Sequence, residues 1–127
     1  MSDARRPKAV FFNVLQIQMP VGALTSITHR VTGSFLAFGI PFSIYLLDLS
    51  LQGPQGYARV SGWFDAFAFR VAAVLSVWML AHHVLAGIRH LLMDIDVGSH
   101  LPAARHSAWI VNLGGVALAL LAAGVLL

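Results

Sequence analysis

The sequence contains no cysteine, and this absence removes several kinds of chemistry at once. Without a thiol, the chain can form no disulfide, no thiolate metal site and no cysteine-ligated iron–sulfur cluster. A redox centre held by this chain would therefore need nitrogen ligands, or would bind without any protein ligand.

Charged residues are also scarce, at 10% of the 127 residues, whereas 58% are hydrophobic and the mean hydropathy is +0.79. This balance excludes an ordinary soluble domain. Three apolar runs, roughly 31–51, 67–93 and 109–127, are long enough to cross a bilayer. With their flanking turns, the predicted spans cover about 22–51, 64–93 and 106–127. The connections are too short for a second domain, so we predict one all-α integral membrane domain over residues 1–127.

The segments outside the spans are predicted from their turn-forming residues. Residues 1–20 form a polar and then mixed arm that ends at Pro20, and we expect this arm to lie at the membrane interface. Residues 51–65 contain three glycines and a proline, which predicts a turn-rich loop. His100 and His106 fall in the connection before the third span and are expected to be solvated loop residues.

The positive charges predict the orientation of the chain. Six of the eight Lys and Arg residues lie before the first span or at the connection between the second and third: Arg5, Arg6, Lys8, Arg30, Arg89 and Arg105. Only Arg59 and Arg70 lie near the other connection. The positive-inside rule then places the N-terminus of this multi-pass protein in the cytoplasm. The net charge of +3 is explained by topology, and no nucleic-acid patch is visible.

The second span carries two adjacent histidines, His82 and His83, near its middle. An ionisable group at membrane depth is costly and is a functional candidate, although a buried imidazole bonded to a neighbouring helix is the plainer alternative. Gly87, one turn beyond His83, leaves room for a flat group or another backbone. Helical spacing defines two neighbouring stripes, the first with Ser76, Leu80, His83, Gly87, His90 and Asp94, the second with His82, Ala86, Arg89 and Met93.

Polar residues also gather at the start of the first span. Ser26, His29, Arg30 and Gly33 recur at helical spacing, although a snorkelling arginine and a hydroxyl bonded to its own backbone would explain the same pattern. His29, Arg30, Arg89 and His90 are predicted to form a cationic ring at the inner interface. His83 would lie roughly 15 Å from the inner end of its helix.

Haem b fits this arrangement because its iron accepts an imidazole, its ring suits the bilayer interior and its propionates need interfacial cations. Zinc fits less well, since no further ligands are suitably spaced. His82 projects about 100° away from His83, and His90 lies about 10 Å along the same helix. Because neither can take the opposite axial position, we expect one haem shared with a second subunit, and hence a heteromeric helix bundle.

Two other predictions concern a quinone and the third span. Ser26 and Arg30 could bind a quinone head group, because a hydroxyl and a fixed cation would polarise its carbonyl oxygens and stabilise the reduced oxyanion. The third span presents small residues for close helix packing and is expected to be structural. These residues are Gly114, Gly115, Ala119 and Ala122.

Two stretches carry a resemblance to a known family. Residues 26–33, SITHRVTG, resemble the S-x-x-H-R-x-[ST]-G signature of the cytochrome b556 membrane-anchor subunits of succinate dehydrogenase. The second signature of that family is similar to His83-x-x-x-Gly87-Ile88-Arg89-His90-Leu91-x-Met93-Asp94. The chain departs from the pattern in a longer stretch between Arg6-Pro7 and Ser26, and in the presence of His82 beside His83.

The resemblance implies a bacterial inner-membrane complex in which a flavoprotein oxidises succinate, an iron–sulfur subunit passes the electrons on, and two anchor subunits bind haem b and reduce ubiquinone. It implies that His83 is an axial haem ligand, that Ser26 and Arg30 contact the quinone, and that His29 and Arg30 lie near the haem propionates. The alternative is a structural anchor with neither haem nor quinone. A small transporter is disfavoured, because three spans show no inverted repeat.

Overall fold

The computed structural model describes residues 18–127, so most of the predicted arm, with Arg5, Arg6 and Lys8, lies outside the described residues. All regular structure in this described range is helical: α1 (Val21–Leu51), α2 (Pro54–Trp63), α3 (Phe67–Asp94) and α4 (Leu101–Leu126). Helices α1, α3 and α4 are long and apolar enough to span a membrane. The prediction of an all-α protein with three spans is confirmed.

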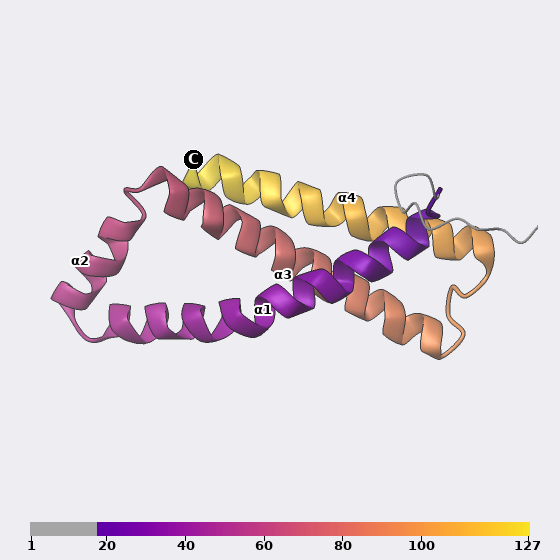
Figure 1. Ribbon diagram of the computed structural model, residues 1–127, viewed down its shortest axis with the longest axis horizontal. Helices are drawn as coiled ribbons and strands as arrows, with labels where there is room; N and C mark the ends of the chain where they lie inside the picture. Colours follow the sequence, from indigo (N-terminus) through magenta and orange to yellow (C-terminus); the bar gives the residue numbers. More distant parts are fainter. Residues whose placement is uncertain (1–17) are drawn as a thin grey trace, which may run out of the picture.

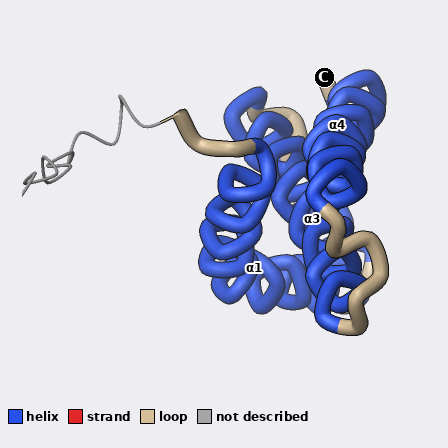
Figure 2. The backbone as a smooth tube through the Cα atoms, turned by 90° about the vertical axis from the view of Figure 1, so that its right-hand side faces the viewer, coloured by secondary structure: helices blue, strands red, loops and turns tan. Residues whose placement is uncertain are grey.

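The three long helices alternate in direction (Figure 1). The start of α1, the end of α3 and the start of α4 therefore lie at one end of the molecule, which we call the proximal end. Helix α2 lies at the opposite, distal end, where Arg70 Nη1 in α3 donates a hydrogen bond to the Leu126 carbonyl at 3.4 Å. Helix α4 runs along α3, whereas α1 crosses it, and the end-on view separates α1 from the α3–α4 pair (Figure 2).

The core is concentrated towards the proximal end. Apart from Leu49, the buried residues of the described chain lie in α1 up to Leu36, in α3 from His82 onward and in α4 up to Gly115. They are Thr25, Thr32, Leu36, His82, Ala86, Arg89, Ala108, Val111 and Gly115. Four of these side chains are polar or charged, so hydrogen bonding must satisfy this part of the core.

Helix α1 changes direction midway along its length (Figure 1), and it contains Pro41. Proline lacks the N–H that would continue the helical ladder, and its ring disfavours a straight helix. The nearby Ser43 hydroxyl donates to the Gly39 carbonyl at 2.9 Å. An apolar groove of about 840 Å³ lies between this part of α1 and the first half of α3, with Phe38, Phe42 and Phe69 in its lining.

Two predicted loops are wrong in part. Residues 51–65 contain helix α2, because Pro54 occupies its first turn and Gly53, at φ 122°, reverses the chain before it. Gly56 is needed there, since a Cβ would collide with the Leu49 carbonyl oxygen. Helix α4 begins at Leu101, before the predicted start at residue 106, so His106 is an exposed helical residue and not a loop residue.

Candidate functional site

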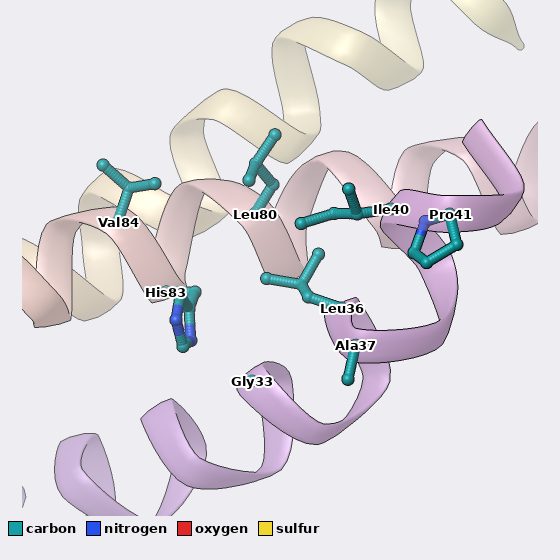
Figure 3. A pocket seen from close by; sticks show the side chains of 8 residues that line it. All are labelled: Gly33, Leu36, Ala37, Ile40, Pro41, Leu80, His83 and Val84. Carbon is teal, nitrogen blue, oxygen red and sulfur yellow. The ribbon is translucent and has the colours of Figure 1, made fainter. Parts of the chain in front are cut away.

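His83 projects from α3 towards the turn of α1 that contains Gly33 (Figure 3). Its Nδ1 lies 3.1 Å from the His29 carbonyl oxygen and 3.4 Å from Thr32 Oγ1. A carbonyl oxygen can only accept, so Nδ1 carries the proton and donates to His29. In the tautomer that this bond selects, the lone pair of a neutral imidazole is on Nε2, which is the arrangement that metal-binding histidines use.

A cavity of about 510 Å³ lies beside this imidazole, between α1 and α3. Among the described residues, His83 contributes the only ionisable side chain to a lining that is otherwise apolar: Gly33, Leu36, Ala37, Ile40, Pro41, Leu80 and Val84 (Figure 3). Gly33 allows α1 to approach, since a Cβ at this position would lie 2.9 Å from His83 Cε1. The site therefore offers one oriented nitrogen ligand to an apolar group.

Two further imidazoles continue from His83 towards the proximal end. The His29 ring stacks on His83 with centroids 4.2 Å apart and planes 14° apart, and its centroid lies 5.1 Å from that of His90. His29 also lies beside Gly87, where a Cβ would meet His29 Nε2 at an ordinary contact distance of 3.5 Å. From the sequence, Gly87 is expected to leave room for a group beside His83. In the structure, His29 lies next to Gly87, and the glycine that packs against His83 is Gly33.

The predicted cationic ring does not form with all four members. Arg89 is only 7% exposed and turns towards α4, where its Nε donates to Ser107 Oγ at 3.0 Å and its Nη2 donates to the Ala104 carbonyl at 3.1 Å. Adjacent helical residues diverge by about 100°, so Arg89 and His90 face different neighbours. Arg89 belongs to the His82 stripe, whose members His82, Ala86 and Arg89 are the buried residues of α3.

Ser26 and Arg30 lie one turn apart in the opening turns of α1. Ser26 is half-buried, Arg30 is exposed, and within residues 18–127 neither side chain makes a hydrogen bond. Back-bonding occurs instead at Thr25, whose hydroxyl lies 2.9 Å from the Val21 carbonyl oxygen. A hydroxyl donor and a guanidinium are thus both accessible to a ligand at the proximal end.

His82 has a different environment from its neighbour. It is 1% exposed, and its Nε2 lies 3.0 Å from Asn112 Oδ1 of α4. The same oxygen lies 3.2 Å from Thr25 Oγ1 of α1. His82 therefore matches the alternative of an imidazole bonded between helices. Sequence reasoning missed Asn112, although a single amide within an apolar span is a signal that could have identified it.

Two of the four small residues predicted to allow close packing of α4, Gly114 and Gly115, lie against α3. A Cβ at Gly115 would lie 3.2 Å from His82 Cβ, and one at Gly114 would lie 3.0 Å from Leu85 Cδ1. These glycines bring α4 close to α3 and set the depth at which Asn112 meets His82.

Comparison with known proteins gives a consistent result. The sequence model of the succinate dehydrogenase/fumarate reductase transmembrane subunit family matches residues 4–122. The chain is 31% identical over 122 residues to a succinate dehydrogenase cytochrome b556 subunit from Paracoccus denitrificans, covering 95% of this chain and 94% of the relative. A subunit of the same name from Coxiella burnetii is 29% identical over 119 residues and covers 86% of each chain. The multi-pass membrane chain belongs to the family of succinate dehydrogenase and fumarate reductase transmembrane subunits.

Proposed function

We propose that this chain is a membrane-anchor subunit of succinate dehydrogenase that holds one haem b together with a second anchor subunit and contributes to the site of ubiquinone reduction. The family match supports the anchor role. The names of the relatives, cytochrome b556 subunits, support haem b. The iron–sulfur and flavoprotein subunits complete the proposed complex, in a bacterial inner membrane with the N-terminus of this chain in the cytoplasm.

The observation that carries the haem proposal is the hydrogen bond from His83 Nδ1 to the His29 carbonyl, at 3.1 Å. It fixes the tautomer so that Nε2 can bind iron, and the carbonyl acceptor makes the imidazole a better ligand. Among residues 18–127 no group of three or more His, Asp or Glu side chains is placed to hold a metal ion. A single imidazole at an apolar cavity fits haem, which needs only one axial ligand from this chain.

When bound, haem b would supply a one-electron redox centre. The residues of this chain would hold and orient it: His83 as the axial ligand, with His29, His90 and the exposed Arg30 as donors for the propionates. We do not propose Arg89 for this role, because its guanidinium donates to Ser107 and Ala104 of α4.

Ser26 and Arg30 would bind the quinone at the proximal end. Quinone reduction places negative charge on the carbonyl oxygens before protonation. Arg30 would stabilise this charge, and the Ser26 hydroxyl would orient the head group. The alternative is an anchor that binds neither ligand, and the buried contacts of Asn112 with Thr25 and His82, which join the three spans without any ligand, favour it as the second candidate.

The test is the reduced-minus-oxidised visible spectrum of the purified complex. The low-spin haem signal should be present in the wild type, absent in His83→Leu and retained in His82→Gln, at matched flavin content. A complex without haem would favour the structural anchor. Loss of the signal in the His82 variant alone would assign the ligand to His82.

A further inference from the structure

Three polar side chains from the three spanning helices meet near the middle of the proximal half. Asn112 Oδ1 of α4 lies 3.0 Å from His82 Nε2 of α3 and 3.2 Å from Thr25 Oγ1 of α1. Thr25 is 0% exposed and His82 is 1% exposed. One amide group therefore bonds both of the other spans in the interior of the protein.

Thr25 and His82 differ in whether another hydrogen-bond partner is available when Asn112 is lost. The Thr25 hydroxyl has one proton, which it can donate either to Asn112 Oδ1 at 3.2 Å or to the Val21 carbonyl oxygen at 2.9 Å, so it keeps an acceptor without Asn112. His82 has no such reserve, because its Nδ1 is buried and has no hydrogen-bond partner among the described residues. Loss of Asn112 would leave both ring nitrogens unsatisfied, which is costly in a buried position.

The neighbours of these two residues are the proposed ligand-binding residues. Thr25 directly precedes Ser26, and His82 directly precedes His83. Because successive residues of a helix point about 100° apart, fixing the direction of one fixes the direction of the next. Asn112 therefore contributes to the direction in which Ser26 and His83 point, without touching either.

Close packing of α4 makes this arrangement rigid. Gly115 lies one turn from Asn112, and a Cβ there would come within 3.2 Å of His82 Cβ. On the other side of α3, Gly33 of α1 packs against His83. Helix α3 is thus held between α1 and α4, and a rotation that followed loss of the Asn112 bonds would move the His83 imidazole relative to the cavity.

We infer that Asn112 is a positioning residue that orients the quinone-binding turn of α1 and the haem-binding turn of α3 through Thr25 and His82. The expected effects on haem and quinone rest on the proposed function. The contact of Asn112 with Thr25 and His82 does not, because it joins the three helices without any ligand. Helix α4 then has a role in the site that its apolar sequence does not suggest.

The test compares Asn112→Leu with Leu113→Ala, a control on the exposed face of α4. In the purified complex, Asn112→Leu should shift the low-field resonance of the haem in electron paramagnetic resonance spectra. It should also raise the KM for quinone roughly five- to tenfold, the range expected for loss of one buried hydrogen bond. Succinate oxidation by an artificial acceptor should stay at the wild-type value per flavin. Unchanged haem resonance and unchanged KM would overturn the inference.

A double-mutant cycle distinguishes a specific effect of the Asn112–Thr25 contact from a general loss of helix packing. Thr25→Val should raise the KM for quinone while leaving the haem resonance unchanged, because it breaks only the α1 bond. In the Asn112→Leu background the same substitution should add less than about twofold, since its partner is already gone. Fully additive effects would overturn the inference. If the complex with Asn112→Leu does not assemble, Thr25→Val alone tests the inference, and an unchanged KM for quinone in that variant would overturn it.

Hydrogen exchange gives a readout that needs neither haem nor quinone. Backbone amides of residues 21–29 should exchange faster in the Asn112→Leu complex than in the Leu113→Ala complex. If the wild type binds no haem and reduces no quinone, the proposed function fails, but faster exchange would still establish the contact. Equal exchange in the two variants would overturn the inference by itself.

Discussion

The imidazole of His29 lies flat on that of His83, with ring centroids 4.2 Å apart, while the backbone carbonyl of His29 accepts the proton of His83 Nδ1. One residue thus contacts the proposed ligand twice, once through its side chain and once through its main chain. Only the main-chain contact fixes the tautomer, and no side-chain substitution removes it.

The first prediction separates these two contacts. His29→Phe should keep the low-spin haem spectrum, because the carbonyl that orients His83 remains in place. The measurement is the reduced-minus-oxidised spectrum at matched flavin content. If His29→Phe abolished the signal, the imidazole nitrogens of His29, and not its carbonyl, would be holding the ligand.

The second prediction uses two glycines of α1. Gly33→Ala should lower the haem content of the complex, since the new Cβ would lie 2.9 Å from His83 Cε1 and would displace the ring. Gly39→Ala is the matched control, because a Cβ there meets nothing within 4 Å. Haem is measured per flavin in both variants. Equal haem content would show that His83 does not need the contact with α1.

The third prediction concerns the quinone. Arg30→Leu should depress succinate-driven quinone reduction by roughly ten- to a hundredfold, because a hydrogen bond to a charged group is worth about 1.5–3 kcal/mol. Ser26→Ala should lower it by about fivefold, as expected for a neutral bond. Both activities are measured on membranes with matched flavin. Equal loss of artificial-acceptor activity would assign these residues to assembly, and unchanged quinone kinetics would place the site elsewhere.

The fourth prediction concerns Arg89. Arg89→Met should lower the thermal stability of the purified complex, because Ser107 Oγ and the Ala104 carbonyl each lose a charged donor, at about 1–3 kcal/mol per bond. Arg105→Met, at an exposed position of α4, is the control. The haem midpoint potential should stay close to that of the wild type. A large shift of the haem midpoint potential with unchanged thermal stability would indicate that Arg89 interacts with the haem propionates.

The fifth prediction concerns subunit composition. The chain expressed alone should bind no six-coordinate haem, because residues 18–127 contribute no second ionisable side chain to the cavity beside His83. Visible and electron paramagnetic resonance spectra of the purified chain are the measurement. A bis-imidazole spectrum from the isolated chain would contradict the shared site.

The helices and their buried stripes could be predicted from the sequence because hydrophobic length and helical spacing determine them. The spacing placed His82, Ala86 and Arg89 on one side of α3, and these are its buried residues. The direction of a long side chain could not be predicted in the same way, since Arg89 reaches an acceptor on α4 that only tertiary packing brings near. Helix α2 was missed because Gly53 and Pro54, which read as turn formers, also start a helix.

Asn112 could not be paired from the sequence, because its partners Thr25 and His82 lie 87 and 30 residues away. Periodicity describes one helix at a time and contains no information about which helix lies opposite. The assignment of His83 by the family spacing stays a prediction, and the cavity beside it supports that prediction.

The concentration of the core at the proximal end has a consequence for how this chain tolerates change. Thr25 and Ala108 are both 0% exposed, so added volume at either must displace a helix, whereas Phe38, towards the distal half, is 82% exposed. In a saturation mutagenesis experiment, sensitivity should therefore divide along the membrane normal. Each long helix should have one intolerant half and one permissive half, and the boundary should fall at similar depth in all three.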